Sequence, residues 1–291
     1  MTTHFKVLIL CLATILFTTS CSKEGSNESP LAAVSIEPLK NIFETIAGDR
    51  FRTYTIMPQG NNPETFELSS IGRFNVEKSD LIITTGLMPF EKQLLKSSDN
   101  KQRFINVSEG IDFIYGTHYH NDANNRSKRH AHKVADPHVW LSPQNNIIIA
   151  RNIKDYLCRI DPKNAETYES NYKIYAQKLE AIDADISAKL SDLKVKSFIV
   201  WHPSLSYFAK DYGLNQISVS SDNKEASVGS VASIIKQAKE KGVKVMFFQK
   251  EFDMRQASTI SDELNANVIL INPVSYDWES QLQIIVDGLT E

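Results

Sequence analysis

Short apolar runs alternate with segments of helical periodicity along most of the chain. In the first half each apolar run is typical of a buried strand, and it is followed by a segment where apolar residues recur every three or four positions. The predicted strands of this half cover residues 31–36, 51–57, 80–85 and 104–107. Strands that alternate with helices at this spacing predict a mainly parallel sheet flanked by crossover helices.

The second half of the chain repeats this alternation. Its predicted strands cover residues 198–201, 216–219, 243–248 and 268–271. Helical patterns follow them over residues 204–212, 231–241 and 254–264, and a last helix starts at Glu279. The pattern therefore predicts a second α/β unit of the same kind as the first.

A long helical pattern separates the two halves. Asp161 and Pro162 stand where a helix N-cap and first helical residue are expected. Apolar residues then recur in steps of three and four for about 30 residues, which predicts a helix roughly 45 Å long. We interpret residues 161–194 as a rigid helix joining an N-terminal lobe, 31–160, to a C-terminal lobe, 195–291. The alternative is an ordinary long surface helix.

The first twenty residues have the shape of a secretory signal. Lys6 precedes an apolar run, 7–17, that is too short to span a bilayer comfortably. Small residues before Cys21 resemble a lipobox, although Thr18 stands where Leu is usual. We predict a signal peptide over 1–20, lipidation of Cys21 and a polar tether over 21–30. The protein is then periplasmic or at the cell surface, held on a bacterial membrane by lipid. Simple secretion and a cytosolic location are the alternatives.

The cysteine content and the charge pattern limit which disulfides and binding partners the protein can have. Outside the signal and Cys21 only Cys158 remains, so no intramolecular disulfide is expected, and its apolar surroundings predict a buried small residue. The net charge of −3 comes from interspersed charges of both signs. No basic stripe points to nucleic acid, and no apolar stretch after the signal points to a membrane span. We expect a monomer whose partner is either a small molecule or ion, or another protein.

Five of the seven histidines lie between His118 and His138. The tract up to His132 is polar and lacks apolar periodicity, so we predict a loop over residues 118–133. Neutral imidazole is a good zinc ligand, and such a tract can bind metal weakly. Its histidines are His118, His120, His130 and His132. His138 differs, because it lies between a proline and two large apolar residues. In such a stiff setting it can be a strong ligand if partners converge on it.

Three further polar residues occupy similar positions. Glu64, His202 and Asp277 each follow a predicted strand in a turn-rich segment near a proline. Ligand sites of open α/β sheets form outside the carboxyl ends of strands. Together with His138, these residues would place two ligands on each side of the long helix and a metal between the lobes. Four nitrogen and oxygen ligands suit Zn²⁺, and two imidazoles with two carboxylates also suit Mn²⁺ or Fe²⁺.

Each of these residues also has an ordinary structural interpretation. His138 could be a satisfied structural histidine, and His202 could simply end a strand. Glu64 could be a polar turn residue, and Asp277 could be the N-cap of the last helix. No local spacing such as HExxH ties the four together, so spacing by itself is weak evidence.

Several segments resemble a known family. They are MPQGNNPETFELS, KSDLIITTGLMPFE, the histidine-rich tract, DPHVWLSP, the helix opening DPKNAETYESNYKIYAQKLEAID, VWHPSLSYFAKDYGL and NPVSYDW. In this order they resemble the metal-binding substrate-binding proteins of ABC importers, the ZnuA/TroA type. The resemblance covers nearly the whole chain after Cys21. It implies two α/β lobes joined by a rigid helix, a metal between them, no catalysis, and delivery of that metal to an ABC permease and its ATPase.

The resemblance also bears on the metal. The family usually has a histidine in the segment matched by NNPETFE, and Glu64 stands at or beside that position. Either Glu64 is the ligand or the site has three strong protein ligands. At the third metal-ligand position of the family, manganese binders tend to carry a carboxylate and zinc binders a histidine. This chain has His202 at that position. A histidine-rich tract is also typical of zinc members, although here it is short and contains basic residues, among them Lys128, Arg129 and Lys133. We therefore predict Zn²⁺, with Mn²⁺ or Fe²⁺ as alternatives.

Two other functions remain open from the sequence. One is a surface adhesin or metal scavenger that works without a permease. The other is a secreted metalloenzyme, in which the metal activates water. A catalytic zinc keeps an open coordination position and needs a general base nearby. No obvious base exists outside the four predicted ligands, so we do not expect an enzyme.

Overall fold

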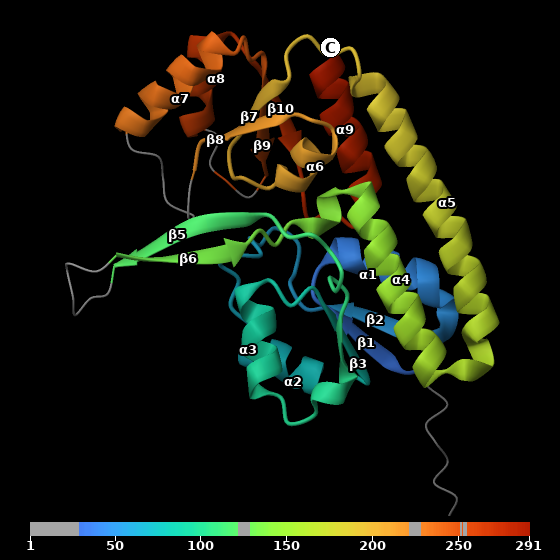
Figure 1. Cartoon of the computed structure of the whole chain (residues 1–291). Helices are drawn as coiled ribbons and strands as arrows, with labels where there is room; N and C mark the ends of the chain where they lie inside the picture. The colour runs from blue at the N-terminus through green and yellow to red at the C-terminus, as the bar shows by residue number, and fades with distance from the viewer. Residues whose placement is uncertain (1–28, 122–128, 221–227, 251, 253–254) are drawn as a thin grey trace, which may run out of the picture.

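The computed structural model describes residues 29–121, 129–220, 228–250, 252 and 255–291 (Figure 1). The predicted signal peptide, Cys21 and most of the tether lie outside these residues. Within them, no helix combines the length and apolar character that crossing a bilayer requires.

The N-terminal lobe is built on a four-stranded parallel sheet with the order β2-β1-β3-β4. Its strands are β1 (Leu31–Val34), β2 (Arg52–Thr55), β3 (Leu81–Thr84) and β4 (Phe104–Asn106). The two central strands, β1 and β3, are almost wholly buried, as their apolar runs predict. Its helices are α1 (Glu37–Ala47), α2 (Ser70–Glu77) and α3 (Pro89–Ser97), with single 3₁₀ turns at Gly48–Arg50 and Lys101–Arg103.

The C-terminal lobe repeats this architecture with the order β10-β9-β7-β8, again all parallel. Its strands are β7 (Ser197–Val200), β8 (Asn215–Ser218), β9 (Val245–Gln249) and β10 (Asn267–Ile271). Its helices are α6 (Ser206–Asp211), α7 (Val228–Glu240), α8 (Arg255–Leu264) and α9 (Trp278–Thr290). The predicted fold class, two α/β lobes with mainly parallel sheets, is confirmed.

The linking helix is α5 (Ala165–Leu190), preceded by a 3₁₀ turn at Pro162–Asn164. Its 26 residues make it roughly 39 Å long. It packs against α4 (Pro143–Ile160) and α1 of the N-terminal lobe and, toward its C-terminal end, against α9, so it contacts both lobes (Figure 1). Asp161 caps no main-chain amide. Its carboxylate instead accepts hydrogen bonds from the side chains of Asn164 at 2.6 Å and Tyr168 at 2.7 Å.

One apolar core extends from the N-terminal lobe through α4 and α5 into the C-terminal lobe. Trp140, Tyr168 and Trp278 are fully buried members of it. A second cluster fills the far side of the C-terminal sheet. The two lobes are therefore joined by packed side chains as well as by the chain itself.

The histidine-rich tract differs from its prediction. It forms an antiparallel hairpin of β5 (Tyr115–Asn121) and β6 (Arg129–Ala135), not an irregular loop. The backbone register pairs His118 with His132 and His120 with His130. An isolated ribbon needs no apolar face to pair its main-chain groups, so apolar periodicity could not reveal it. Its side chains, and residues 122–128, lie outside the described part of the chain.

Candidate metal centre

Glu64 is held by a fixed turn after β2. The chain leaves the strand at Thr55 and turns at Gly60, whose φ of 83° favours glycine. Asn62 then organises the next residues, because its Oδ1 accepts the Glu64 amide at 2.8 Å and its carbonyl accepts the Phe66 amide at 2.9 Å. The Phe66 ring packs edge-on against Phe90 of α3, with ring centroids 5.1 Å apart. These contacts direct the Glu64 carboxylate toward the C-terminal lobe.

His138 follows β6 and is almost completely buried, at 2% exposure. Asp136 holds it through one oxygen, Oδ1, which lies 2.9 Å from the His138 amide nitrogen and 2.8 Å from Nδ1. In the neutral imidazole this contact places the proton on Nδ1 and leaves Nε2 able to bind metal. The Trp140 ring packs beside His138, at 5.3 Å between centroids. Its Nε1 donates to the Pro273 carbonyl at 2.7 Å, which joins the lobes next to the site.

His202 follows β7 and is 3% exposed. Its main chain is fixed by Gln249, a fully buried residue at the end of β9. The Gln249 Oε1 accepts the His202 amide at 3.1 Å, and its Nε2 donates to the His202 carbonyl at 2.6 Å. The imidazole stacks on Phe252, with centroids 5.8 Å apart. Within the described residues neither ring nitrogen has a hydrogen-bond partner. Buried polar atoms are normally paired, so this imidazole suits a metal ligand.

These three side chains converge. Glu64 Oε1 lies 3.3 Å from His202 Nε2, and the two imidazole centroids are 5.4 Å apart. One ligand atom from each of Glu64, His138 and His202 lies within 4.8 Å of the others. Two imidazoles and one carboxylate form a common zinc ligand set, in which metal–ligand distances are about 2.0–2.2 Å. Ligand atoms this close need only small movements to meet on one ion. One lobe supplies Glu64 and His138, and the other supplies His202.

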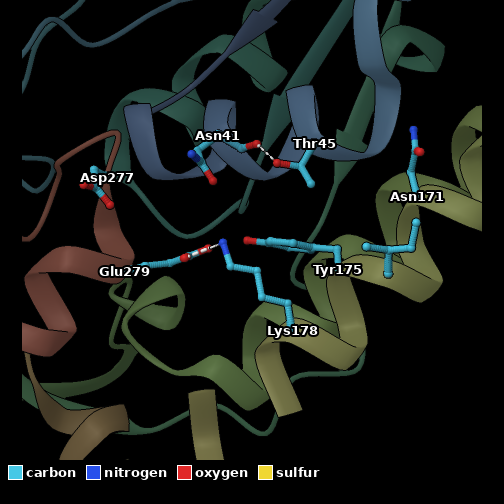
Figure 2. A pocket seen from close by; sticks show the side chains of 8 residues that line it. Asn41, Thr45, Asn171, Tyr175, Lys178, Asp277 and Glu279 are labelled. Carbon is cyan, nitrogen blue, oxygen red and sulfur yellow. Dashed lines mark hydrogen bonds and ion pairs between the residues drawn. The ribbon is translucent and has the colours of Figure 1, made fainter. Parts of the chain in front are cut away.

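Asp277 lies outside this cluster. It is the N-cap of α9, where its Oδ1 accepts the Ser280 amide at 3.2 Å and its Oδ2 accepts the Ser280 hydroxyl at 2.6 Å. These donors, more than any other group, lower the pKa of the carboxyl. Asp277 also lines a pocket of about 430 Å³ between α1, α5 and α9, together with Tyr175, Lys178 and Glu279 (Figure 2). The sequence placed it among the ligands, but the start of the helix engages its carboxylate.

The sequence analysis overlooked the residues that hold the ligands. Asp136 could have been found from the sequence, because its place two positions before His138 suits a side chain that bonds to the main chain nearby. Gln249 and Phe252 gave no signal, because they come from a distant strand end. The side chains of the hairpin histidines His118, His120, His130 and His132 lie outside the described part of the chain.

The comparisons with known proteins agree with this architecture. The family described as "Zinc-uptake complex component A periplasmic" matches residues 33–284. The zinc-binding protein AdcA of Streptococcus pyogenes is 28% identical over 267 residues, which cover 87% of this chain and 52% of that protein. The chain thus spans about half the length of the first curated relatives it matches.

Two other relatives match over most of both chains. The high-affinity zinc uptake system protein ZnuA of Bacillus subtilis is 28% identical over 278 residues, covering 91% of this chain and 86% of that protein. A crystal structure of ZnuA superposes with a TM-score of 0.79 at 29% identity, covering 90% of this chain and 98% of the other. With a family match over most of its length, two parallel-sheet lobes and an interlobe cluster of metal-ligand side chains, the chain belongs to the ZnuA family of zinc-uptake components.

Proposed function

We propose that the protein is an extracytoplasmic receptor that binds Zn²⁺ and delivers it to an ABC permease and its ATPase. The observation that carries the proposal is the meeting of Glu64 and His138 from one lobe with His202 from the other. A metal held there is shielded from water and contacts both lobes. The names of the relatives, zinc-binding protein AdcA and zinc uptake protein ZnuA, support the same role. The role is transport, not catalysis.

The ligand chemistry favours zinc. Imidazole is a good ligand for Zn²⁺, and two of the three converging side chains are histidines. Glu64 adds an oxygen ligand, which Mn²⁺ also accepts. The same role for Mn²⁺ is therefore the second candidate. A fourth ligand for zinc would come from water or from a group outside the three residues.

The proposal also covers how the receptor is held on the membrane and what its histidine-bearing hairpin does. Lipidation of Cys21 would hold the receptor on the membrane. Ser29, eight residues later, is fixed to the N-terminal lobe, because its carbonyl accepts a hydrogen bond from Arg52 Nε at 3.1 Å. We propose that the hairpin collects metal weakly through its four histidines. Residues directly opposite in an antiparallel ladder have Cβ atoms about 5 Å apart. The pairing of His118 with His132 and of His120 with His130 suits shared ions.

A competition titration tests the metal proposal. The chain starting at Cys21 would be stripped of metal and titrated with Zn²⁺ and Mn²⁺ against a chelating dye. We expect one tight zinc site that Mn²⁺ displaces poorly. Tighter binding of Mn²⁺ would favour the second candidate, and the absence of any tight site would contradict both.

Two further measurements test the partner and the anchor. A strain that lacks the gene should grow slowly only when zinc is limiting, and added zinc should restore growth. Mass spectrometry of the mature N-terminus should show a lipid-modified Cys21. An unmodified N-terminus would exclude the lipid anchor and leave the metal proposal intact.

A further inference from the structure

The hydroxyl of Tyr207 closes the base of the histidine-bearing hairpin. Tyr207 lies in α6 of the C-terminal lobe and is 2% exposed. Its oxygen accepts the amide of Ile114 at 3.2 Å and donates to the carbonyl of Asp136 at 3.0 Å. Ile114 directly precedes β5 and Asp136 directly follows β6, and the Asp136 amide donates to the Ile114 carbonyl at 2.8 Å. One side chain of one lobe thus holds both ends of a hairpin from the other.

Asp136 contacts both Tyr207 and the metal cluster. Its carbonyl is bound by Tyr207, while its carboxylate oxygen Oδ1 binds both the amide and Nδ1 of His138. The direction of the His138 ring therefore depends on where Asp136 is held. Tyr207 itself stands five residues after His202. The segment that supplies the histidine of the C-terminal lobe also fixes the support of the histidine from the N-terminal lobe.

We infer that Tyr207 is a positioning residue for the metal centre, holding Asp136 so that the His138 imidazole faces His202. The inference rests on the proposed metal-binding function and adds a residue to it. Residues that orient metal-ligating histidines commonly change metal affinity by about 10–100-fold when removed. Tyr207 contacts Asp136 and not the histidine itself, so we expect a loss of zinc affinity near the lower end of that range.

The chemistry of Tyr207 suits this role. Burial raises the pKa of its phenol well above the ordinary value, so the group stays a neutral hydroxyl that donates and accepts at once. A phenylalanine would keep the ring and its packing. It would leave the Ile114 amide without the phenol oxygen and the Asp136 carbonyl without its donor. Groups left unpaired in a buried place tend to move toward water, which would carry Asp136 with them.

Other contacts of α6 make this substitution a local one. Lys210 pairs with Asp112 at 2.6 Å, and Asp211 accepts the Ser142 hydroxyl at 2.5 Å. Both contacts join the two lobes next to the hairpin base. Since neither involves the phenol, the helix should stay in place when the hydroxyl is removed.

The test compares Tyr207→Phe with Tyr168→Phe. Tyr168 is also fully buried, and its hydroxyl donates to Asp161 at 2.7 Å near the start of α5. Zinc affinity would be measured by competition with a chelating dye, the coordination geometry by the absorption spectrum of the Co²⁺-loaded protein, and stability by urea unfolding. We expect Tyr207→Phe to lower zinc affinity about tenfold and to alter the Co²⁺ spectrum. Tyr168→Phe should lose similar stability without changing affinity or spectrum.

A double-mutant cycle tests whether Tyr207 acts through Asp136. If it does, adding Tyr207→Phe to Asp136→Ala should cost little further affinity. Independent, additive losses would overturn the inference, as would parent-like affinity and spectrum in Tyr207→Phe alone. Binding of Mn²⁺ in place of Zn²⁺ by the parent would overturn the zinc proposal only. The same variants titrated with Mn²⁺ would then decide the role of Tyr207.

Discussion

The metal cluster and the pocket beside α9 both contain polar side chains from the two lobes. The two places differ in how far these side chains are buried and in which groups they contact. In the cluster His138 and His202 are at most 3% exposed, and the Glu64 carboxylate faces a histidine of the opposite lobe. In the pocket Asp277 is exposed and engaged by Ser280, three residues along the chain. Glu279 there pairs with Lys178 at 2.6 Å. The cluster brings its carboxylate and imidazoles together across the two lobes, whereas the charged groups of the pocket are engaged by Ser280 and by each other.

This difference shows what makes a carboxylate a candidate ligand. Glu64 and Asp277 share a sequence context, since both follow a strand and lie near a proline. Only the first is directed at two buried imidazoles. Burying an ion is costly unless opposite charge and hydrogen bonds surround it, and Glu64 offers that charge at the buried place. The Asp277 carboxylate instead accepts hydrogen bonds from Ser280 at the start of α9.

The largest effect should come from His202→Ala. Among the three cluster residues His202 is the one that the C-terminal lobe supplies, so its loss would leave a metal bound to one lobe. We expect zinc affinity to fall at least about a hundredfold, or ~2.7 kcal/mol. A chelator competition would measure this. Parent-like affinity would mean that zinc binds elsewhere in the protein.

Glu64 should have a smaller but clear effect. Glu64→Ala should lower zinc affinity by at least about tenfold, or ~1.4 kcal/mol, because a charged ligand is lost. Glu64→His should keep zinc and widen the gap between zinc and manganese, since Mn²⁺ favours oxygen ligands. Glu67→Ala, an exposed carboxylate three residues on, is the matched control and should change neither. If Glu64→Ala bound zinc as tightly as the parent, Glu64 would be a turn residue only.

Removal of the hairpin should spare the tight site. Deleting residues 119–133 leaves Ile114 and Asp136, which Tyr207 holds, in the chain. We expect titration calorimetry to show fewer weakly bound zinc ions and a tight site within about twofold of the parent. Loss of the tight site as well would make the hairpin part of the primary centre.

Asp277→Ala should leave zinc binding unchanged and lower stability by about 1 kcal/mol, the usual cost of a lost N-cap. The pKa of Asp277 is lowered in the folded state by the donors of Ser280. Its contribution is therefore fully present above the pKa of the unfolded chain, near 4, and is lost as pH falls through the lower folded value. Urea unfolding at pH 7 and pH 3 would show the difference shrinking. A tenfold loss of zinc affinity would place Asp277 at the metal after all.

The sequence predicted the two sheets well because their central strands, β1, β3, β7 and β9, are buried apolar runs. All eight predicted strands of the lobes exist, and α5 lies where the long periodic pattern stood. It did not reveal the hairpin, whose residues have no apolar face, or α4, for which an apolar pattern around Cys158 was noted without a helix being assigned. α2 begins at Ser70, because Ser69 caps it by accepting the Gly72 amide at 3.1 Å.

Local sequence predicted the site in part. His138 and His202 were recognisable because each stands beside a proline and large apolar residues where strands end. The contacts that orient them were not, since Gln249 lies 47 positions from His202 and Tyr207 lies 71 from Asp136. The position of Asp277 outside the cluster has a related cause. Its position fits both a ligand and a helix cap, and only the packing of α9 separates the two.

The contacts that close the lobes on each other also bear on how fast the chain can fold. Tyr276 donates to Glu44 across 232 positions at 2.6 Å, and Trp140 donates to Pro273 across 133 positions. Closing such long loops costs chain entropy, and folding slows as contacts become more distant in sequence. The N-terminal lobe thus meets its final neighbours only when the last twenty or so residues are present. Zinc bound by Glu64, His138 and His202 would likewise join residues that lie far apart in the sequence, so it would stabilise long-range contacts between the lobes and not local ones.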